Sequence, residues 1–437
     1  MGHITNSDNE YHLLQHRISQ KVQGNRESET LIKILGILFS PEDAALARKL
    51  PHSLTPVDVL SKKLGLSEKY LAEKLTEMAR RGVVFDLVRK GRRYVMLPPV
   101  VIGFFEFVFM RTRSDLPMKE LAHLFETYFT EDNGALARSF WQGQTQLTRT
   151  FVMEETIPQQ IDRTEILDWE KATHVISTAT AISVGICQCH HLAQHHGTAC
   201  DKPEEVCLTF NYIAEGLSKN GHARAISKDE AMDILSRCKE HNLIQIGDNV
   251  QRRVSFICNC CSCCCTLLRG IRNYEITNGV VSSNWIMEVE LSKCTGCGKC
   301  AKACPVDAIR IEDSEDRGLK KRWAVRDAEI CLGCGVCSKV CGSGGAVMQP
   351  RAKRIIAPET VFDQHIAMAV ERGRLAELLF DNSEKLSHRA LGRVVKLIEQ
   401  SAPFRAAMAS ESIKSSFVNV LVNGAKKQAG ELAEHLT

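Results

Sequence analysis

The sequence contains no long hydrophobic run. Its longest apolar stretch, Gly103–Met110, is interrupted by Glu106, and it is far shorter than the roughly 20 residues of a membrane-spanning helix. The first residues, Met1–Glu10, are polar and acidic and lack the apolar segment of a signal peptide. These absences exclude a membrane span and predict a cytoplasmic protein.

Cysteine is absent before Cys187 and after Cys341, although the chain of 437 residues holds 19 of them. Disulfide frameworks are typical of short secreted chains, so this confinement to one region predicts metal binding instead. Because exposed thiolates and the metal centres that they hold oxidise readily, a metal-binding region of this kind also indicates an anaerobic or low-oxygen cell.

Several cofactor motifs are missing as well. The sequence has no Walker-type phosphate loop, no dinucleotide fingerprint and no Gly-x-Ser-x-Gly motif. The glycine-rich segment Gly342–Gly345 follows a cysteine and not a strand. No site for a nucleotide, NAD or flavin is therefore predicted. A net charge of only +4 argues against extensive nucleic-acid binding but permits a local basic patch.

What the sequence does contain is a doubled cysteine run with the spacing C-x2-C-x2-C-x3-C. This spacing binds 4Fe–4S clusters in bacterial ferredoxins. Zinc sites usually appear as two separated C-x2-C pairs, so a zinc ribbon is the weaker interpretation. The first run comprises Cys294, Cys297, Cys300 and Cys304, and the second comprises Cys331, Cys334, Cys337 and Cys341.

On these two runs, residues 288–350 resemble a bacterial-type ferredoxin domain with two 4Fe–4S clusters. The resemblance implies that the fourth cysteine of each run binds the cluster of the other run. One cluster would be held by Cys294, Cys297, Cys300 and Cys341, and the other by Cys331, Cys334, Cys337 and Cys304. The chain departs from the family in two ways. Gly342 stands where the first run has Pro305, and the long connection Ile309–Val325 predicts a hairpin with a polar turn at residues 313–318.

A second cysteine-rich region precedes the ferredoxin-like one. Adjacent thiolates repel one another unless a metal neutralises them, so we expect these side chains to be metal ligands. They would supply four ligands to each of one or two further 4Fe–4S clusters, with the first four cysteines facing the run 258–265. The ten residues are Cys187, Cys189, Cys200, Cys207, Cys258, Cys260, Cys261, Cys263, Cys264 and Cys265.

Zinc is the alternative in this second region. Histidine is a borderline ligand that suits zinc, and His190, His191, His195 and His196 lie close to Cys189. Histidines in a polar loop are more often solvated than bound to a metal. Cys238 belongs to neither interpretation, because it falls on the apolar face of a predicted helix, Ser227–His241, and is expected in the core.

Residues 30–98 show the order of elements of a winged-helix domain. The sequence contains helix starts at Ser40 and Thr55, then a helix over Ser67–Arg81, and then two strands within Val83–Leu97. In DNA-binding members the third helix enters the major groove. Here that helix is nearly neutral, and the cations gather in the strand turn. The pattern therefore favours a docking module over a DNA-binding domain. The cations of the turn are Arg89, Lys90, Arg92 and Arg93.

Together these patterns predict an α+β multidomain protein. We expect a polar arm at 1–29, a winged-helix-like domain at 30–98, a helical connecting region at 99–182, a cysteine-rich iron–sulfur domain at 183–287, the ferredoxin domain at 288–350 and a helical C-terminal region at 357–437.

The predicted function is that of an iron–sulfur protein that relays single electrons to a partner oxidoreductase, as a donor or as a subunit of a larger complex. The alternative is a redox-sensing transcriptional regulator that binds DNA through the winged-helix-like domain. A third hypothesis places catalysis at residues 187–265, but the sequence shows no separate acid or base there. No catalytic residue is therefore predicted, and whether the chain is itself an enzyme stays open.

Overall fold

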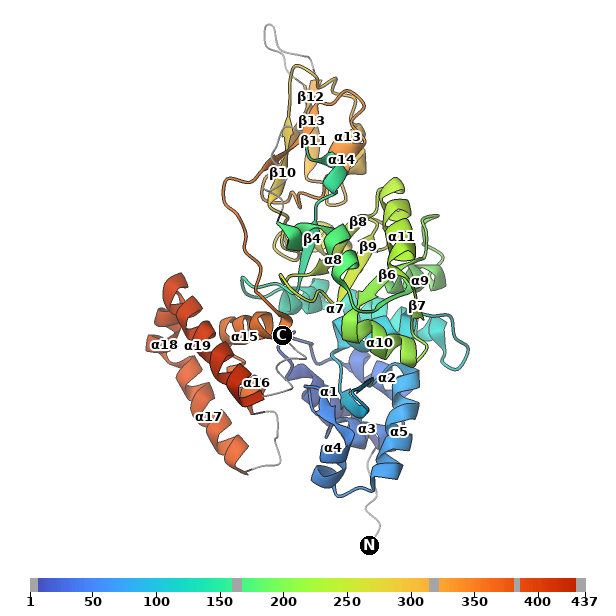
Figure 1. Cartoon of the computed structure of the whole chain (residues 1–437), viewed down its shortest axis with the longest axis vertical. Coiled ribbons are helices and arrows are strands. Elements are labelled where there is room, and N and C mark those ends of the chain that lie inside the picture. The colour runs from blue at the N-terminus through green and yellow to red at the C-terminus, as the bar shows by residue number, and fades with distance from the viewer. Residues whose placement is uncertain (1–6, 159–166, 314–321, 381–385, 430–437) are drawn as a thin grey trace.

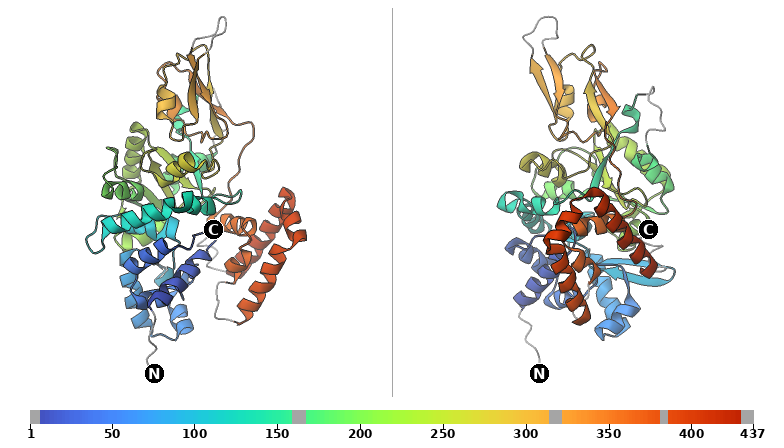
Figure 2. Two further views of the ribbon diagram at one scale, coloured as in Figure 1. Left: turned by 180° about the vertical axis from the view of Figure 1, so that it is seen from behind. Right: turned by 90° about the vertical axis from the view of Figure 1, so that its left-hand side faces the viewer.

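The computed structural model describes residues 7–158, 167–313, 322–380 and 386–429. These residues form an α+β structure in four parts (Figure 1). A helical N-terminal part lies at one end of the molecule, a six-stranded sheet lies in the middle, and a small cysteine-rich tip lies at the other end. A group of C-terminal helices lies at the side, and the two further views in Figure 2 show the same arrangement.

The N-terminal part combines short helices with a three-stranded antiparallel sheet of order β1-β3-β2. The predicted helix boundaries are set by local caps. The hydroxyl of Ser40 accepts a hydrogen bond from the Asp43 amide, while Gly65 and Gly82 end two helices at φ values of 65° and 87°. The elements are α1 (Ser7–Ser19), α2 (Glu29–Leu38), α3 (Pro41–Ala47), β1 (Thr55–Pro56), α4 (Val57–Leu64), α5 (Glu68–Arg81), β2 (Phe85–Arg89) and β3 (Arg92–Met96).

Helix α1 packs against the rest of this part, because Leu14 and Ile18 are fully buried in its core. The same core takes in α6 (Phe105–Phe109) and α7 (Met118–Phe140). Aromatic side chains of these two helices fill much of it. The winged-helix assignment itself stays a prediction.

The central sheet has the strand order β4-β8-β9-β6-β5-β7, and every neighbouring pair is antiparallel. Its first strand comes from the segment that was predicted to be a helical connection, so that segment contributes to the sheet as well as to helices. The strands are β4 (Thr148–Phe151), β5 (Ile182–Ile186), β6 (Glu205–Phe210), β7 (Arg224–Ala225), β8 (Ile244–Asp248) and β9 (Phe256–Cys260).

The two faces of this sheet have different neighbours. Val184, Leu208 and Ile257 point into a core shared with two helices, α8 and α11. Cys238 is fully buried in that core, which confirms its predicted place. The helices around the sheet are α8 (Ala172–Thr178), α9 (Gln188–His195), α10 (Asn211–Lys219), α11 (Lys228–Glu240) and α12 (Thr266–Tyr274).

The tip contains two antiparallel strand pairs and two short helices. The predicted hairpin is present as β11 (Ile309–Asp313) paired with β12 (Arg322–Arg326), whereas most of its polar turn lies outside the described residues. The second pair joins the two ends of the segment, β10 (Trp285–Val289) and β13 (Ala346–Pro350). The helices are α13 (Lys299–Ala303) and α14 (Val336–Lys339).

The C-terminal part is helical, as predicted. Its elements are α15 (Val361–Glu371), α16 (Leu375–Leu379), α17 (Leu386–Gln400), α18 (Ala402–Met408) and α19 (Glu411–Ala429). Across the parts of the chain that the structure describes, no helix is both long enough and apolar enough to cross a bilayer.

Candidate metal centres

The tip holds two small cavities, and four cysteines line each of them. Each cavity measures about 20 Å³. The structure thus groups the eight cysteines into the two crossed sets that the ferredoxin resemblance implies. The outer set is Cys294, Cys297, Cys300 and Cys341. The inner set is Cys304, Cys331, Cys334 and Cys337.

Glycine makes these two cysteine loops possible. Gly296 and Gly333 occupy equivalent places in the two runs and have φ values of 66° and 68°, a region that side chains disfavour. A β-carbon at Gly333 would lie 2.0 Å from the carbonyl oxygen of Trp285. The loop can therefore lie directly against the neighbouring strand only because this residue has no side chain.

The two sets differ in their electrostatic surroundings. In the inner set, burial raises the pKa of Cys334 to about 12 and also raises the pKa values of Cys337 and Cys304. In the outer set Cys297 is exposed, and the backbone N–H of Lys299 lowers its pKa. Buried thiols with raised pKa values ionise only when a cation compensates the charge, which suits metal ligands.

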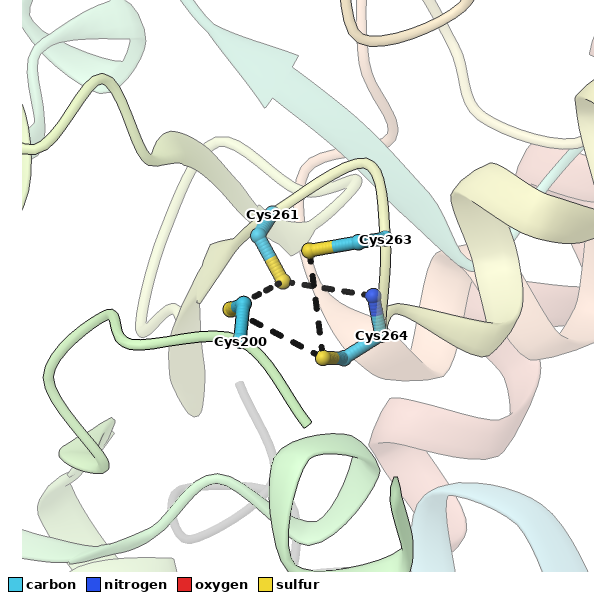
Figure 3. Close-up of side chains that lie close together, drawn as sticks. All are labelled: Cys200, Cys261, Cys263 and Cys264. Atoms are coloured by element: carbon cyan, nitrogen blue, oxygen red, sulfur yellow. Dashed lines mark hydrogen bonds between the residues drawn. The ribbon is translucent and has the colours of Figure 1, made fainter. Parts of the chain in front are cut away.

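The ten cysteines of the second region separate into a group of four and a group of six. The group of four consists of Cys200, Cys261, Cys263 and Cys264, whose sulfur atoms all lie within 4.8 Å of one another (Figure 3). The Sγ atoms of Cys200 and Cys261, and those of Cys200 and Cys264, are 3.8 Å apart. Among the described residues, no other group of three or more cysteine, histidine or carboxylate side chains has all its ligand atoms this close together.

These distances have a simple geometric meaning. A tetrahedral ion with metal–sulfur bonds of about 2.3 Å holds its four sulfur atoms about 3.8 Å apart. A 4Fe–4S cluster spreads its ligands more widely, because each thiolate binds a different iron. The group of four therefore fits a single tetrahedral ion better than a cluster.

The group of six lines a much larger cavity of about 170 Å³. Electrostatic interactions between neighbouring thiols link its members in a string. One such interaction raises the pKa of Cys187 and lowers that of Cys189. Along the string the members are Cys187, Cys189, Cys265, Cys260, Cys258 and Cys207.

The alternation of side chains along β9 explains this separation. Successive residues of a strand point to opposite faces. Cys258 and Cys260 therefore line the large cavity, while Ile257 and Cys261 pack into the core on the other side. The strand β6 places Cys207 on the cavity side as well.

The histidines near Cys189 are not in a polar loop, and that expectation is wrong. His190 and His191 lie in α9 and are buried. A ring nitrogen of His190 lies 2.9 Å from the carbonyl oxygen of Cys200, and one of His191 lies 2.8 Å from that of Phe109. These hydrogen bonds hold the backbone around the cysteines in place. Cys189 is also in this helix.

The structure adds a carboxyl group that sequence reasoning did not assign to a site. Glu106 of α6 lines the same cavity as the six thiols, and one of its oxygens accepts a hydrogen bond of 2.7 Å from the Gly103 amide. Burial raises its pKa to about 8. Its only signal in the sequence was an acidic residue inside the longest apolar stretch.

The comparison with protein families gives one match. Residues 293–344 match the family described as the 4Fe–4S dicluster domain. No curated protein and no solved structure matches the chain. The match covers the tip and leaves the rest of the molecule to be interpreted from its own residues. The tip is therefore a ferredoxin-type 4Fe–4S domain that holds at least one cluster and has an electron-transfer role.

Proposed function

We propose that the chain relays single electrons through three iron–sulfur sites in series, from the outer set through the inner set to the group of six cysteines, and from there to a partner oxidoreductase. The donor atoms fit this role, because all 19 cysteines are free thiols. When bound, iron–sulfur clusters supply one-electron redox chemistry at potentials that the surrounding protein sets.

The observation that carries this proposal is continuous packing between the three sites. One hydrophobic cluster contains Cys334 of the inner set together with Cys260 and Cys265 of the group of six. A second cluster contains Cys300 of the outer set together with Cys337 of the inner set. The inner set therefore lies between the other two sites and contacts the surroundings of both.

Backbone contacts hold the tip against the central sheet. The Met153 amide donates a 3.0 Å hydrogen bond to the carbonyl oxygen of Cys334, and the Met153 side chain is fully buried in the cluster that joins the two sites. Arg272 of α12 pairs with Asp307 of the tip at 2.7 Å. These contacts suit a fixed relay within one chain.

The outer set is the side from which electrons enter in this proposal. Cys297 is exposed, whereas Cys334 of the inner set is buried within protein. An external donor can therefore approach the outer set more closely.

We assign the group of four a different role. Its short sulfur–sulfur distances favour one tetrahedral zinc ion, the alternative that the sequence left open. Zinc has no redox chemistry, so this site would stay outside the relay. Its role would be to join the segment around Cys200 to the turn at Cys261–Cys264.

The regulator hypothesis gains no support from the basic turn. Arg92 pairs with Asp58, and Arg93 pairs with the buried carboxylate of Asp86. These guanidinium groups are partly neutralised within the protein, and phosphate binding needs several available cations on one surface. We therefore propose a docking role for the N-terminal part.

Metal analysis of anaerobically purified protein tests this proposal. We expect about eight irons from the two ferredoxin sets, further iron from the group of six, and about one zinc. Reduction should produce paramagnetic signals that broaden as neighbouring clusters become reduced. The double variant Cys207→Ser/Cys258→Ser should lose only the iron beyond the first eight. If the wild type holds about eight irons and the double variant holds the same number, the third site of the relay does not exist.

A further inference from the structure

The cavity beside the six cysteines is several times larger than the cysteine-lined cavities of the tip. It measures about 170 Å³, against about 20 Å³ for each of the other two. Helix α12 follows it from Cys265 at the helix start to Tyr274 at its end, a length of about 13 Å. The thiols therefore line one part of a longer space.

Most of the remaining wall is apolar or aromatic. Helices α6 and α7 contribute a set of large side chains, and Gly270 of α12 lets the ring of Trp141 lie against the helix, where a β-carbon would approach it to 2.5 Å. An apolar cavity of about 150 Å³ is large enough to bind benzene. The aromatic lining includes Phe105, Phe129, Phe140, Trp141 and Tyr274.

Three polar groups in this wall have no hydrogen-bond partner among the residues that the structure describes. They are the indole nitrogen of Trp141, the hydroxyl of Thr148 and the amide oxygen of Gln188. Their residues are only 6%, 1% and 6% exposed. Buried polar groups in folded proteins are nearly always paired, so a ligand whose polar group reaches one of these atoms after a small side-chain movement would gain a hydrogen bond.

The charged groups of the wall are already engaged. Arg269 pairs with Glu126 at 2.5 Å, and Glu106 accepts a hydrogen bond from the Gly103 amide. A charged ligand would therefore bring an uncompensated charge into an apolar space, which is costly. The wall selects an uncharged ligand.

We propose that this cavity binds a small, uncharged, ring-containing organic molecule with one polar substituent. The ring lies among the aromatic side chains, and the substituent bonds to one of the unpaired groups of the wall. The binding does not depend on the electron relay. In combination with the proposed relay, it places the bound molecule next to the last cysteine site.

Fluorine NMR of three probes with the anaerobic, metal-loaded protein tests this inference. Fluorobenzene carries the ring alone, 4-fluorophenol adds an uncharged polar substituent, and 4-fluorobenzoate adds a charge. We expect 4-fluorophenol to bind several-fold more tightly than fluorobenzene, and 4-fluorobenzoate not to bind. Failure of both uncharged probes to bind the wild type overturns the proposal.

Two variants locate the binding. Ala137→Phe places a ring inside the cavity, because Ala137 lines it, and should abolish binding of both uncharged probes. Ala406→Phe makes the same change at an exposed position of α18 and should leave binding unchanged. Equal binding by the Ala137→Phe variant contradicts the assigned site.

A third variant covers the case in which Ala137→Phe does not fold. Thr148→Val replaces the unpaired hydroxyl by a methyl group of similar size and should reduce the preference for 4-fluorophenol over fluorobenzene. An unchanged preference would count against the polar part of the proposal. Iron is measured in the same samples, so that missing iron is recognised as a failure of the relay and not of ligand binding.

Discussion

The tip and the central sheet bring cysteines together in two different ways. In the tip, three members of each set come from one loop of fixed spacing, and glycines such as Gly296 and Gly333 allow the turns. In the central part, the pleat of β9 and the strands beside it sort the cysteines to opposite sides of the sheet. Local spacing therefore identifies a site when the ligands share a loop. When the ligands lie on a sheet, strand alternation determines which of them share a site.

The largest expected effect tests the crossed sets of the tip. The double variant Cys294→Ser/Cys341→Ser removes two ligands of the outer set and should lose about four irons. The double variant Cys294→Ser/Cys304→Ser removes one ligand from each set and should weaken both sites, with up to about eight irons lost. Iron and acid-labile sulfide, with circular dichroism as a control for folding, measure the difference. Equal losses in the two variants would contradict the crossing.

The next effect separates the two groups of the central part through neighbouring residues. Cys260→Ala should lower the iron content and leave zinc unchanged, because Cys260 lines the large cavity. Cys261→Ala should remove about one zinc and leave iron unchanged, because Cys261 belongs to the group of four. Elemental analysis of both proteins checks this. A loss of the same metal from both variants would mean that the ten cysteines form one site.

Much of the N-terminal part could be predicted because its signals are local. The cap at Ser40, the helix ends at Gly65 and Gly82, and the hairpin turn each depend on residues a few positions apart. The same kind of local pattern predicted the core position of Cys238, and the burial of this residue confirmed it.

The sites of the central part could not be predicted in the same way, because their partners are distant in sequence. Strand β4 pairs with β8, where Thr150 lies opposite Ile246, so β4 joins a sheet whose other strands follow much later. Glu106 meets the six thiols only through that folding. The sequence showed ten cysteines in one region but not which side of the sheet each one takes.

A smaller effect should appear at the junction between the tip and the sheet. Met153→Ala leaves a cavity in the hydrophobic cluster between Cys334 and Cys260, which should cost about 2–5 kcal/mol of local stability. Hydrogen exchange of the tip amides should accelerate, and electrons should pass more slowly from the inner set to the group of six. Met232→Ala, on the half-buried side of α11, is the control and should leave exchange in the tip unchanged. Unchanged exchange in the Met153 variant would show that this packing does not hold the tip in place.

The smallest effect concerns a titration in a region without cysteine ligands. His222 is buried between the N-terminal part and the sheet, where a ring nitrogen lies 2.7 Å from the carbonyl oxygen of Ala79 and the ring stacks on Phe107. Burial lowers its pKa to about 4, with the nearby charges of Arg111 and Arg113 acting in the same direction. The unfolded chain, with an ordinary histidine pKa, therefore binds the proton more readily than the folded protein.

The stabilisation from neutral His222 is complete above the unfolded pKa of about 6.5 and declines as the pH falls from there towards the folded value. Between about pH 7.5 and about pH 5.5 this group should cost about 1 kcal/mol of stability. His222→Gln keeps a side-chain donor for Ala79 and should remove this part of the slope. The slope that remains comes from His365, whose pKa is also lowered to about 4 by burial, and from His52, whose pKa burial lowers in the same direction. Thermal unfolding followed at both pH values, together with iron analysis, separates this effect from acid loss of the clusters. An identical slope in the variant would show that His222 is solvated in solution, and that the N-terminal part is held less tightly against the sheet than the tip is.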